Sequence, residues 1–309
     1  MTTNWAPLFG ECEQQADQLI FKGSMIEFPP GEGKMSPAIG NFIANRKFAG
    51  GTITVEIEFE DVEPGTACSI IFYYNLARRA FATAGLGGLA LYYINDFDGQ
   101  RWTVHALSGD PKNLKPKRKY VVKVSVIGSY VILNVDEVDV LSFILPGTLS
   151  QSQVGLWCCS KSNITITNYT VLSEAARAFV IMQFTPPYND LYTEVIQRVC
   201  EDTGFGIRTI RADEIYGPGM IVADIEREII EAKLIIAEIT TGNPNVYYEV
   251  GYARALKKPT ILIAEKATQL PFDVSPFRVL FYENSIAGKK RIEDGLRKHI
   301  AAILEDIPH

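Results

Sequence analysis

The sequence predicts two domains of different fold class: an all-β antiparallel sandwich in residues 1–174 and an α/β domain with a flavodoxin-like parallel sheet in residues 175–309. Three observations lead to this division. Apolar residues recur with a period of two up to Leu172, and after Ala178 apolar strands alternate with amphipathic helical segments. The stretch 173–177 between these regions is short and rich in small or polar residues. The 309 residues, 47% of them hydrophobic, are enough for two ordinary cores.

The composition argues against several classes of function. A net charge of −6 speaks against a general nucleic-acid-binding surface and against binding to an acidic membrane. The N-terminus lacks a basic segment followed by an apolar one, and no apolar run is long enough to cross a bilayer. We therefore expect a cytoplasmic protein without a membrane partner. Five cysteines lack the spacing of a metal site or a disulfide framework, which predicts reduced thiols.

The first domain is predicted from short strands that have one buried and one solvated face. In residues 53–59, Ile, Val and Phe alternate with Thr and Glu. Turn clusters at 63–65 and 95–99 separate similar runs, and no helical pattern intervenes. Closely spaced strands of this kind predict an antiparallel sandwich. Further strands are expected at 68–74, 89–94, 102–107, 120–127, 130–135, 154–158 and 163–171.

Several segments of this half resemble the concanavalin A-like, laminin G-type jelly roll, including the branch with 3-keto-disaccharide hydrolase-like domains. The residues that carry the likeness are 40–44, 51–59, 97–102, 120–136 and 154–157. Relatives with this fold bind carbohydrate or mediate contacts, so the resemblance implies a carbohydrate or protein ligand at the sandwich.

Nothing in this half predicts catalysis. Asp96, Asp98 and Asp110 lie in turn contexts, where Asp serves the backbone. Trp102 and Trp157 are expected in the sandwich core. The glycine-rich run 85–88 precedes a predicted strand, whereas phosphate loops open helices, so we interpret it as a turn or bulge.

The second domain is predicted from apolar strands that alternate with amphipathic helices, the pattern of a parallel sheet covered on both faces. In such a sheet, ligands bind at the carboxyl ends of the strands. Strands are expected at 179–184, 207–210, 234–239, 260–264 and 278–281, and helices at 191–200, 222–232, 245–256 and 290–307.

The segment 238–253 is the centre of this domain. A buried strand ends there, and a Gly/Asn/Pro turn leads into a helix. Asn243 before Pro244 predicts a helix start, with an N-cap side chain followed by proline at the first helical position. Glu249 follows Asn245 by four residues and shares its helix face, so both side chains can point into one cleft.

Polar residues follow the first three predicted strands and are expected to converge on one crevice. Histidine triads and histidine–zinc sites are improbable because none of His105, His299 and His309 stands at a strand end. A carboxylate must then act if the domain is an enzyme. The strand-end residues are Gln183, Phe184, Arg211, Asp213, Glu238, Thr240, Asn243 and Asn245.

The chemistry that suits a lone carboxylate here is glycosyl transfer. The helix N-terminus and nearby amides are expected to keep Glu249 ionised, so that it stabilises or attacks an oxocarbenium-like sugar carbon. A cationic leaving group such as nicotinamide needs little acid assistance, which favours NAD as the substrate. No cofactor is expected.

An ordered set of motifs in the second domain resembles the nucleoside 2-deoxyribosyltransferase-like branch of the TIR-like superfamily. In those enzymes the glutamate of the Glu-x-Gly-x-Ala segment is catalytic, which implies this role for Glu249. The resemblance also implies that Asp213 lies near the base or sugar and that Asn243 and Asn245 contact ribose or phosphate. The motifs are 178–184, 211–214, 236–240, 243–253 with Lys258-Pro259, and 271–273.

Two departures from the family pattern affect its transfer to this chain. The third strand of relatives commonly ends in Asp where this chain has Glu238, and the Asp-x-Gly-Thr turn of deoxyribosyltransferases is replaced by 241–245. Gly217 and Gly219 bring backbone N–H groups to a phosphate or belong to a surface loop. Tyr252 stacks on a base or packs on the sheet.

Two functions from different classes remain open. In the first, the second domain cleaves or transfers an N-glycosidic bond of NAD or a nucleoside, and the sandwich is a sensor or assembly module. This architecture resembles bacterial antiviral defence proteins that deplete NAD, and TIR-like enzymes often act when assembled, which implies a homo-oligomer. In the second, both domains only bind ligands: a nucleotide signal in the crevice, and a sugar or protein at the sandwich.

Overall fold

The computed structural model describes residues 3–15, 17–27, 31, 33–202, 204–215, 220–272, 274 and 277–305. The chain divides into two compact units. The first comprises residues 1–126, 131–143 and 151–174, and the second residues 127–130, 144–150 and 175–309. Across the described ranges, no helix is both long enough and apolar enough to span a membrane.

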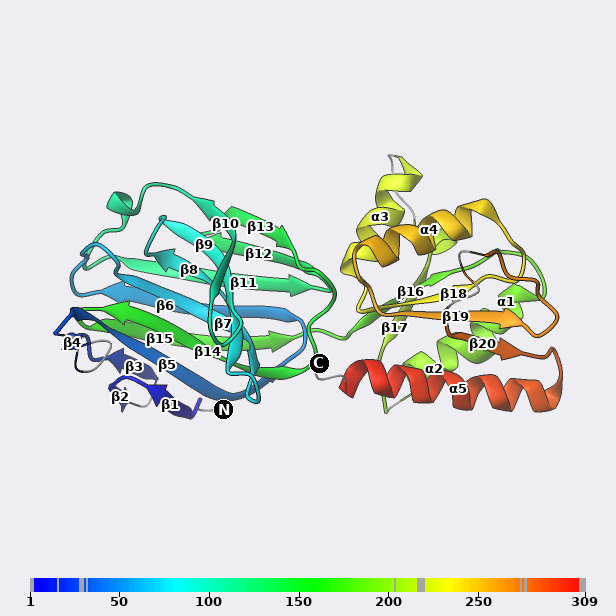
Figure 1. Ribbon diagram of the computed structural model, residues 1–309, viewed down its shortest axis with the longest axis horizontal. Helices are drawn as coiled ribbons and strands as arrows, with labels where there is room; N and C mark the ends of the chain where they lie inside the picture. The colour runs from blue at the N-terminus through cyan, green and yellow to red at the C-terminus, as the bar shows by residue number, and fades with distance from the viewer. Residues whose placement is uncertain are drawn as a thin grey trace. The chain divides into compact units, whose positions relative to one another are not determined.

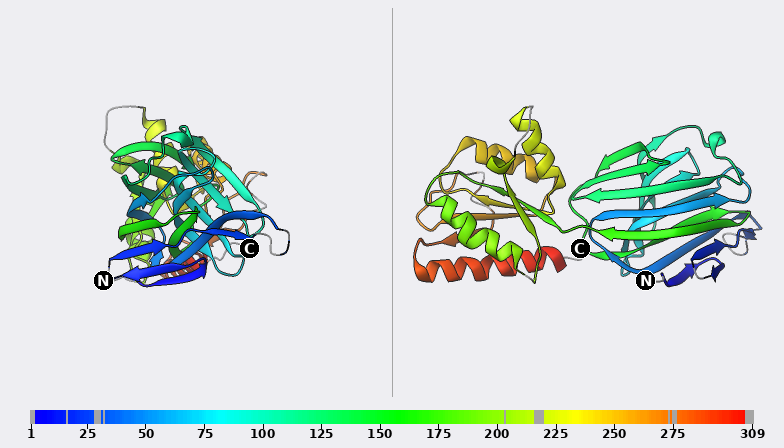
Figure 2. Two further views of the ribbon diagram at one scale, coloured as in Figure 1. Left: turned by 90° about the vertical axis from the view of Figure 1, so that its left-hand side faces the viewer. Right: turned by 180° about the vertical axis from the view of Figure 1, so that it is seen from behind.

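The first unit is a sandwich of two antiparallel sheets, which Figures 1 and 2 show as two layers of strands. We call the sheet with the order β1-β5-β14-β7-β8-β9-β10 sheet A, and β4 pairs with its strand β5. Its strands are β1 (Trp5–Phe9), β4 (Met25–Glu27), β5 (Met35–Phe48), β7 (Ala67–Asn75), β8 (Ala80–Gly87), β9 (Tyr92–Phe97), β10 (Trp102–Ser108) and β14 (Ser152–Ser160).

The second layer, sheet B, has the order β13-β12-β11-β6-β15-β3-β2. A short 3-10 helix, η1 (Pro111–Asn113), precedes β11. The strands are β2 (Cys12–Gln15), β3 (Gln18–Phe21), β6 (Gly51–Phe59), β11 (Lys119–Ile127), β12 (Tyr130–Val135), β13 (Val138–Ile144) and β15 (Ile164–Ser173). The prediction of an antiparallel sandwich is confirmed.

The core of the sandwich lies between the sheets because the central strands are apolar on one side. In β6, every second residue from Gly51 to Phe59 is buried and the residues between are half-buried. From sheet A, Phe42 meets Phe21 of sheet B with ring centroids 6.0 Å apart. The even-numbered residues of β5 around Phe42 therefore face the core, and the odd-numbered ones face away from sheet B.

The glycine-rich run at 85–88 is part of a strand and of the turn after it. Gly85 lies in β8, where a Cβ would come within 2.3 Å of the Cys68 carbonyl oxygen. Gly87, the last residue of β8, and Gly88, the first residue of the following turn, have φ of 88° and 79°. The interpretation as a turn is therefore confirmed for Gly88 only.

The second unit contains a parallel sheet in the described part of the chain. Its strands are β16 (Arg177–Ile181), β17 (Arg208–Arg211), β18 (Leu234–Glu238), β19 (Thr260–Glu265) and β20 (Val279–Tyr282). All four neighbouring pairs are parallel, in the order β17-β16-β18-β19-β20. The order reverses between β16 and β18, the position at which doubly wound sheets bind ligands.

Helices cover both faces of this sheet, as Figure 1 shows. One face packs on α1 (Tyr188–Leu191), the π-helical η2 (Tyr192–Gln197), α2 (Arg198–Glu201) and α5 (Ile286–Glu305) through a core that includes Val180 and Ile236. We call it the α5 face. The opposite face packs on α3 (Ile221–Glu231) and α4 (Pro244–Ala255) through a core that includes Phe179 and Ile235. We call it the α4 face.

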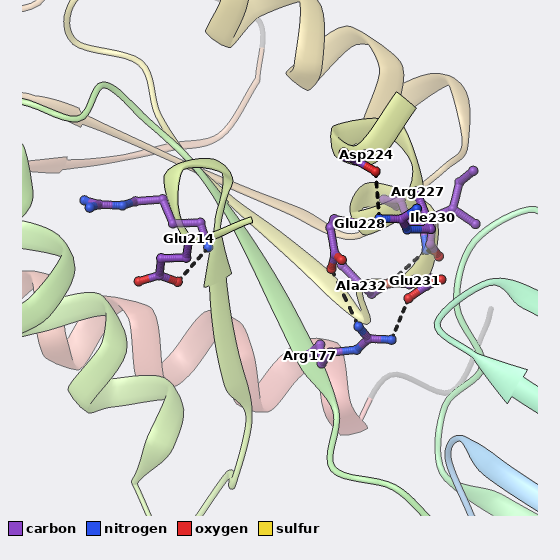
Figure 3. Close-up of polar contacts among 10 residues, drawn as sticks. Arg177, Glu214, Asp224, Arg227, Glu228, Ile230, Glu231 and Ala232 are labelled. Carbon is purple, nitrogen blue, oxygen red and sulfur yellow. Dashed lines mark hydrogen bonds and ion pairs between the residues drawn. The ribbon is translucent and has the colours of Figure 1, made fainter. Parts of the chain in front are cut away.

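An ion-pair network links α3 to the start of β16. Arg177 contacts Glu231 at 2.7 Å and Glu228 at 3.6 Å, and all three side chains are at least partly buried, as Figure 3 shows. Partial burial strengthens such pairs relative to those on the open surface. The network orients α3, from which Glu226 extends toward Tyr248 of α4 at 2.8 Å.

Candidate functional site at the carboxyl edge of the parallel sheet

The helix start predicted at Asn243 is confirmed. The Asn243 side chain accepts a hydrogen bond from the Asn245 backbone N–H at 3.0 Å, and Pro244 is the first residue of α4. Val246, Val250 and Ala253 bury one side of the helix on the α4 face. The Asn243 side-chain oxygen is thus occupied by the cap.

Glu249 is a half-buried carboxyl in the second turn of α4. It follows Val246 by three residues, so it lies beside the buried side of the helix rather than on the solvated one. Burial raises its pKa to about 7. Among the described residues, no hydrogen bond or ion pair to its side chain is formed. The expectation that the helix N-terminus and nearby amides favour the ionised form of Glu249 is not met, because burial raises this pKa.

Arg211 and Asp213 form a bidentate ion pair. The two guanidinium–carboxylate distances are both 2.6 Å, and a third nitrogen of Arg211 donates to Asn189 Oδ1 at 2.8 Å. The guanidinium also lies 4.5 Å from the ring centroid of Tyr192 and 5.1 Å from that of Phe184. Asp213 serves as the partner of a buried arginine, which leaves it less free to act as a catalytic acid than the sequence predicts.

A short 3-10 helix positions Asp213 next to Arg211. Asp213 lies in η3 (Ala212–Glu214), directly after β17. Glu214 Oε2 accepts the Arg211 backbone N–H at 3.1 Å, a contact drawn in Figure 3, and the Tyr192 hydroxyl at 3.1 Å. The Arg211 guanidinium thus connects the end of β17 and the turn η3 with the first helical segment, α1 and η2.

Glu238 is completely buried at the end of β18. Its Oε1 accepts hydrogen bonds from the Thr240 N–H at 3.2 Å, the Thr240 hydroxyl and the Tyr282 hydroxyl at 3.2 Å. Its Oε2 has no hydrogen-bond partner in the described ranges. Burial raises the pKa of this carboxyl. Thr240 also accepts the Glu265 N–H at 2.8 Å, which ties the ends of β18 and β19 together.

Side-chain alternation along the strands divides the predicted set between the two faces of the sheet. Leu234 and Ile236 belong to the α5-face core, so Glu238, two residues further, points to that face. Arg211 points there too, since it packs on Tyr192 of that core. Glu249 belongs to α4, which covers the other face. Glu249 therefore belongs to a different face of the sheet from Glu238 and Arg211.

The remaining predicted residues have the following places. Gln183 Nε2 donates to Thr185 Oγ1 at 3.1 Å, two residues beyond the end of β16. Asn245 is exposed, and Tyr252 is half-buried against the α4-face core. Gly217 and Gly219 lie outside the described residues.

Three residues that the sequence analysis missed stand near Glu238. Tyr282 ends β20, Glu265 ends β19 and Tyr188 begins α1. The pKa of Tyr188 is raised by burial and by the charges of Glu238 and Glu265. The strand-end rule, applied to the fourth and fifth strands as well, would have found Glu265 and Tyr282. In the described part of the chain, no group of His, Cys, Asp or Glu is arranged to hold a metal ion.

A second cluster of interest lies on the face of sheet A that points away from sheet B. Tyr74, Phe81, Phe97 and Trp102 are direct cross-strand neighbours on β7 to β10. Trp102 lies 5.2 Å from Phe97 and 5.3 Å from Trp157 between ring centroids. We call these five residues the aromatic row. The prediction that Trp102 and Trp157 lie in the core is wrong, because both belong to the face that points away from sheet B and 42% of Trp102 is exposed.

Uncharged polar groups flank the aromatic row on the same face. Asn41 is the cross-strand neighbour of Trp157, and Thr83 is the neighbour of Asn95. The side-chain oxygens Asn41 Oδ1, Thr83 Oγ1 and Asn95 Oδ1 are buried without a hydrogen-bond partner within the described ranges. Asp98 and Asp110, by contrast, accept backbone N–H groups of their own turns, as predicted.

Comparison with known proteins finds similarity for about half of the chain. No family model matches, and no curated protein matches. The carbohydrate binding module CBM66 from Bacillus subtilis is similar over 55% of this chain and 95% of its own, with a TM-score of 0.45 and 15% identity. The Bacillus licheniformis beta-glucanase is similar over 54% of this chain and 92% of its own, with a TM-score of 0.35 and 12% identity.

Proposed function

We propose that the second domain, as a flavodoxin-like sheet of the TIR-like kind, cleaves or transfers the N-glycosidic bond of a nucleotide, with NAD as the first substrate. The observation that carries this proposal is Glu249, a half-buried carboxyl with a pKa of about 7 and no partner within the described ranges. Its helix begins at the carboxyl end of β18, beside the reversal of strand order. Perturbed and unpartnered carboxyls at such positions are typical of catalytic groups.

The chemistry needs only this one carboxylate. Ionised Glu249 forms an ester bond to C1′ of the ribose while the bond from C1′ to the pyridinium nitrogen breaks. The electron pair of that bond goes to the nitrogen, so neutral nicotinamide leaves without a proton. Water then attacks C1′, Glu249 departs as carboxylate, and ADP-ribose and a proton are released. When a nitrogen of a free nucleobase attacks C1′ in place of water, a new N-glycosidic bond forms and the reaction is a transfer.

A pKa near 7 suits this cycle. At neutral pH about half of the molecules carry Glu249 in its nucleophilic form. Partial burial reduces the hydration that weakens a carboxylate nucleophile, and it strengthens the attraction between the carboxylate and a cationic sugar carbon. The resemblance to TIR-like enzymes adds that assembly into a homo-oligomer and a role in antiviral defence accompany the activity.

The proposal is tested by incubating the full chain with NAD and, separately, with deoxynucleosides over a range of protein concentrations. We expect release of nicotinamide and formation of ADP-ribose, at a rate per protomer that rises with protein concentration if assembly is required. Chromatography with mass detection identifies both products. Absence of free base from every substrate at the highest protein concentration would refute the proposal.

A second candidate function rests on the sandwich. We propose that sheet A binds a neutral oligosaccharide on the aromatic row. Sugars present apolar C–H faces to aromatic rings and hydroxyls to uncharged polar groups, and both are present here. The oxygens of Asn41, Thr83 and Asn95 are buried acceptors without a partner on this same face, within the described ranges.

Replacing Trp102 by Ala is expected to weaken oligosaccharide binding about tenfold, because the ring supplies stacking area worth about 1.4 kcal/mol. Affinity is measured by calorimetry against a panel of soluble neutral oligosaccharides. Phe9→Ala is the matched control, since Phe9 is an exposed aromatic residue on the edge strand β1 of the same sheet. Equal losses in the two variants would contradict a specific role for the row.

A further inference from the structure

A pocket separate from Glu249 opens at the carboxyl ends of β19 and β20. It has a volume of about 280 Å³ and lies between the first helix of the domain and the start of α5. An adjoining hollow shares Glu265, Tyr282, Glu283 and Asn284 with it. All of these elements pack on the α5 face, whereas Glu249 belongs to the α4 face.

The walls of the pocket carry an excess of negative charge. Asp190, Glu194, Glu265 and Glu283 line it, with Lys289 as its single cationic lining residue among those described. Glu194 is paired twice, with Lys289 at 3.4 Å and with Arg198 at 3.0 Å. At the rim, Lys266 pairs with Glu283 at 2.7 Å.

Two of these carboxylates have no partner among the described residues that offsets their negative charge. Asp190 and Glu265 form no side-chain hydrogen bond or ion pair within the described ranges. A cavity whose net charge is negative raises the local concentration of cations.

The other side of the pocket is apolar. Pro187, Leu191, Val195 and Ile292 line it, together with the ring of Tyr282. Apolar side chains do not coordinate an inorganic cation, and no metal-binding group of side chains is present in the described ranges. The lining therefore fits a molecule that has both an apolar body and a positive charge.

A buried group behind the wall supports the same conclusion. The Tyr282 hydroxyl donates to Glu238, so Glu238 stands directly behind this ring. Glu238 is fully buried, and its Oε2 has no partner in the described part of the chain. A buried polar atom without a partner is unfavourable and needs a physical explanation such as a bound water, an ion or a catalytic role.

We propose that this pocket binds a small organic cation, an amine with an apolar or aromatic body. The ammonium group lies between Asp190 and Glu265, and the apolar body packs on Pro187 and Leu191. The site goes beyond the proposed cleavage of NAD, because it lies on the opposite face of the sheet and its lining does not include Glu249. It gives the domain a second ligand at its carboxyl edge.

The test uses the full chain with benzylamine, which is cationic at pH 7, and benzyl alcohol, its neutral counterpart of similar shape. Ligand-observed NMR titration is expected to give a dissociation constant on the order of 1 mM for benzylamine and at least about tenfold weaker binding for the alcohol. Raising the salt concentration weakens benzylamine binding, since the carboxylates are exposed to solvent.

The double variant Asp190→Asn, Glu265→Gln is expected to weaken benzylamine binding about tenfold. Glu201→Gln is the matched control, because Glu201 is an exposed carboxylate of α2 outside the pocket lining. Equal binding of amine and alcohol overturns the proposal, as does an unchanged affinity in the double variant. No benzylamine binding up to about 20 mM overturns it as well. Since no turnover is measured, these outcomes do not bear on Glu249.

Discussion

Glu249→Gln is expected to lower the rate of nicotinamide release by about 10³-fold or more. The amide keeps the shape of the side chain and removes the negative charge that attacks or stabilises C1′. The rate is measured under saturating NAD, so that weaker binding does not contribute. Glu226→Gln is the control, because Glu226 lies on the neighbouring helix, contacts Tyr248 at 2.8 Å and has no assigned catalytic role. A Glu249 variant that keeps a tenth of the wild-type rate would contradict the assignment.

The pH dependence of the wild-type rate gives an independent reading of the same group. The ionised form of Glu249 is the active one, and its pKa is raised to about 7 by burial. The rate should therefore rise with pH, reach half of its maximum near pH 7 and level off above it. A rate that is already maximal at pH 5 would show that the catalytic group is a carboxylate with an ordinary pKa.

Much of the second domain was predictable because the local sequence signals for strands and helix starts agree with the observed parallel sheet. Asn243 and Pro244 specify the start of α4, and the buried strand before them has no polar residue until Glu238. What the sequence did not reveal is the division of the strand-end residues between two faces. The strand predicted at 179–184 ends at Ile181, and the one predicted at 207–210 ends at Arg211. A shift of one residue moves a side chain to the other face, so such boundaries decide which groups meet.

The sequence also did not reveal which side chains form ion pairs with each other. Asp213 reads as a free strand-end acid, yet Arg211 holds it at 2.6 Å through two contacts. The sequence contains both residues but not the rotamers that join them. In the sandwich, β2 was missed because its residues Glu13, Gln14 and Gln15 are exposed and polar, and β8 was missed because alanine and glycine give no alternation of hydrophobicity.

Glu249→Gln is also expected to change the dependence of stability on pH. The pKa of Glu249 is about 7 in the folded chain and near 4.5 when the group is solvated. Between these values the folded state holds more protons than the unfolded state, so wild-type stability decreases as pH rises from about 4.5 to 7 and is constant above that range. Because the amide does not ionise, the stability of the variant does not decrease in this way as pH rises.

At pH 8 the variant should therefore be more stable than wild type, while at pH 4.5 the two should be equal. The full pKa difference corresponds to about 3 kcal/mol, and screening by water at a half-buried side chain reduces this to about 1–2 kcal/mol. Calorimetric unfolding of the full chain at both pH values, with Glu226→Gln as control, measures the difference. A variant less stable than wild type at pH 8 would mean that Glu249 has a stabilising partner and is a structural residue. Greater stability together with lost turnover is the combination expected of a carboxylate that the fold keeps desolvated for its chemistry.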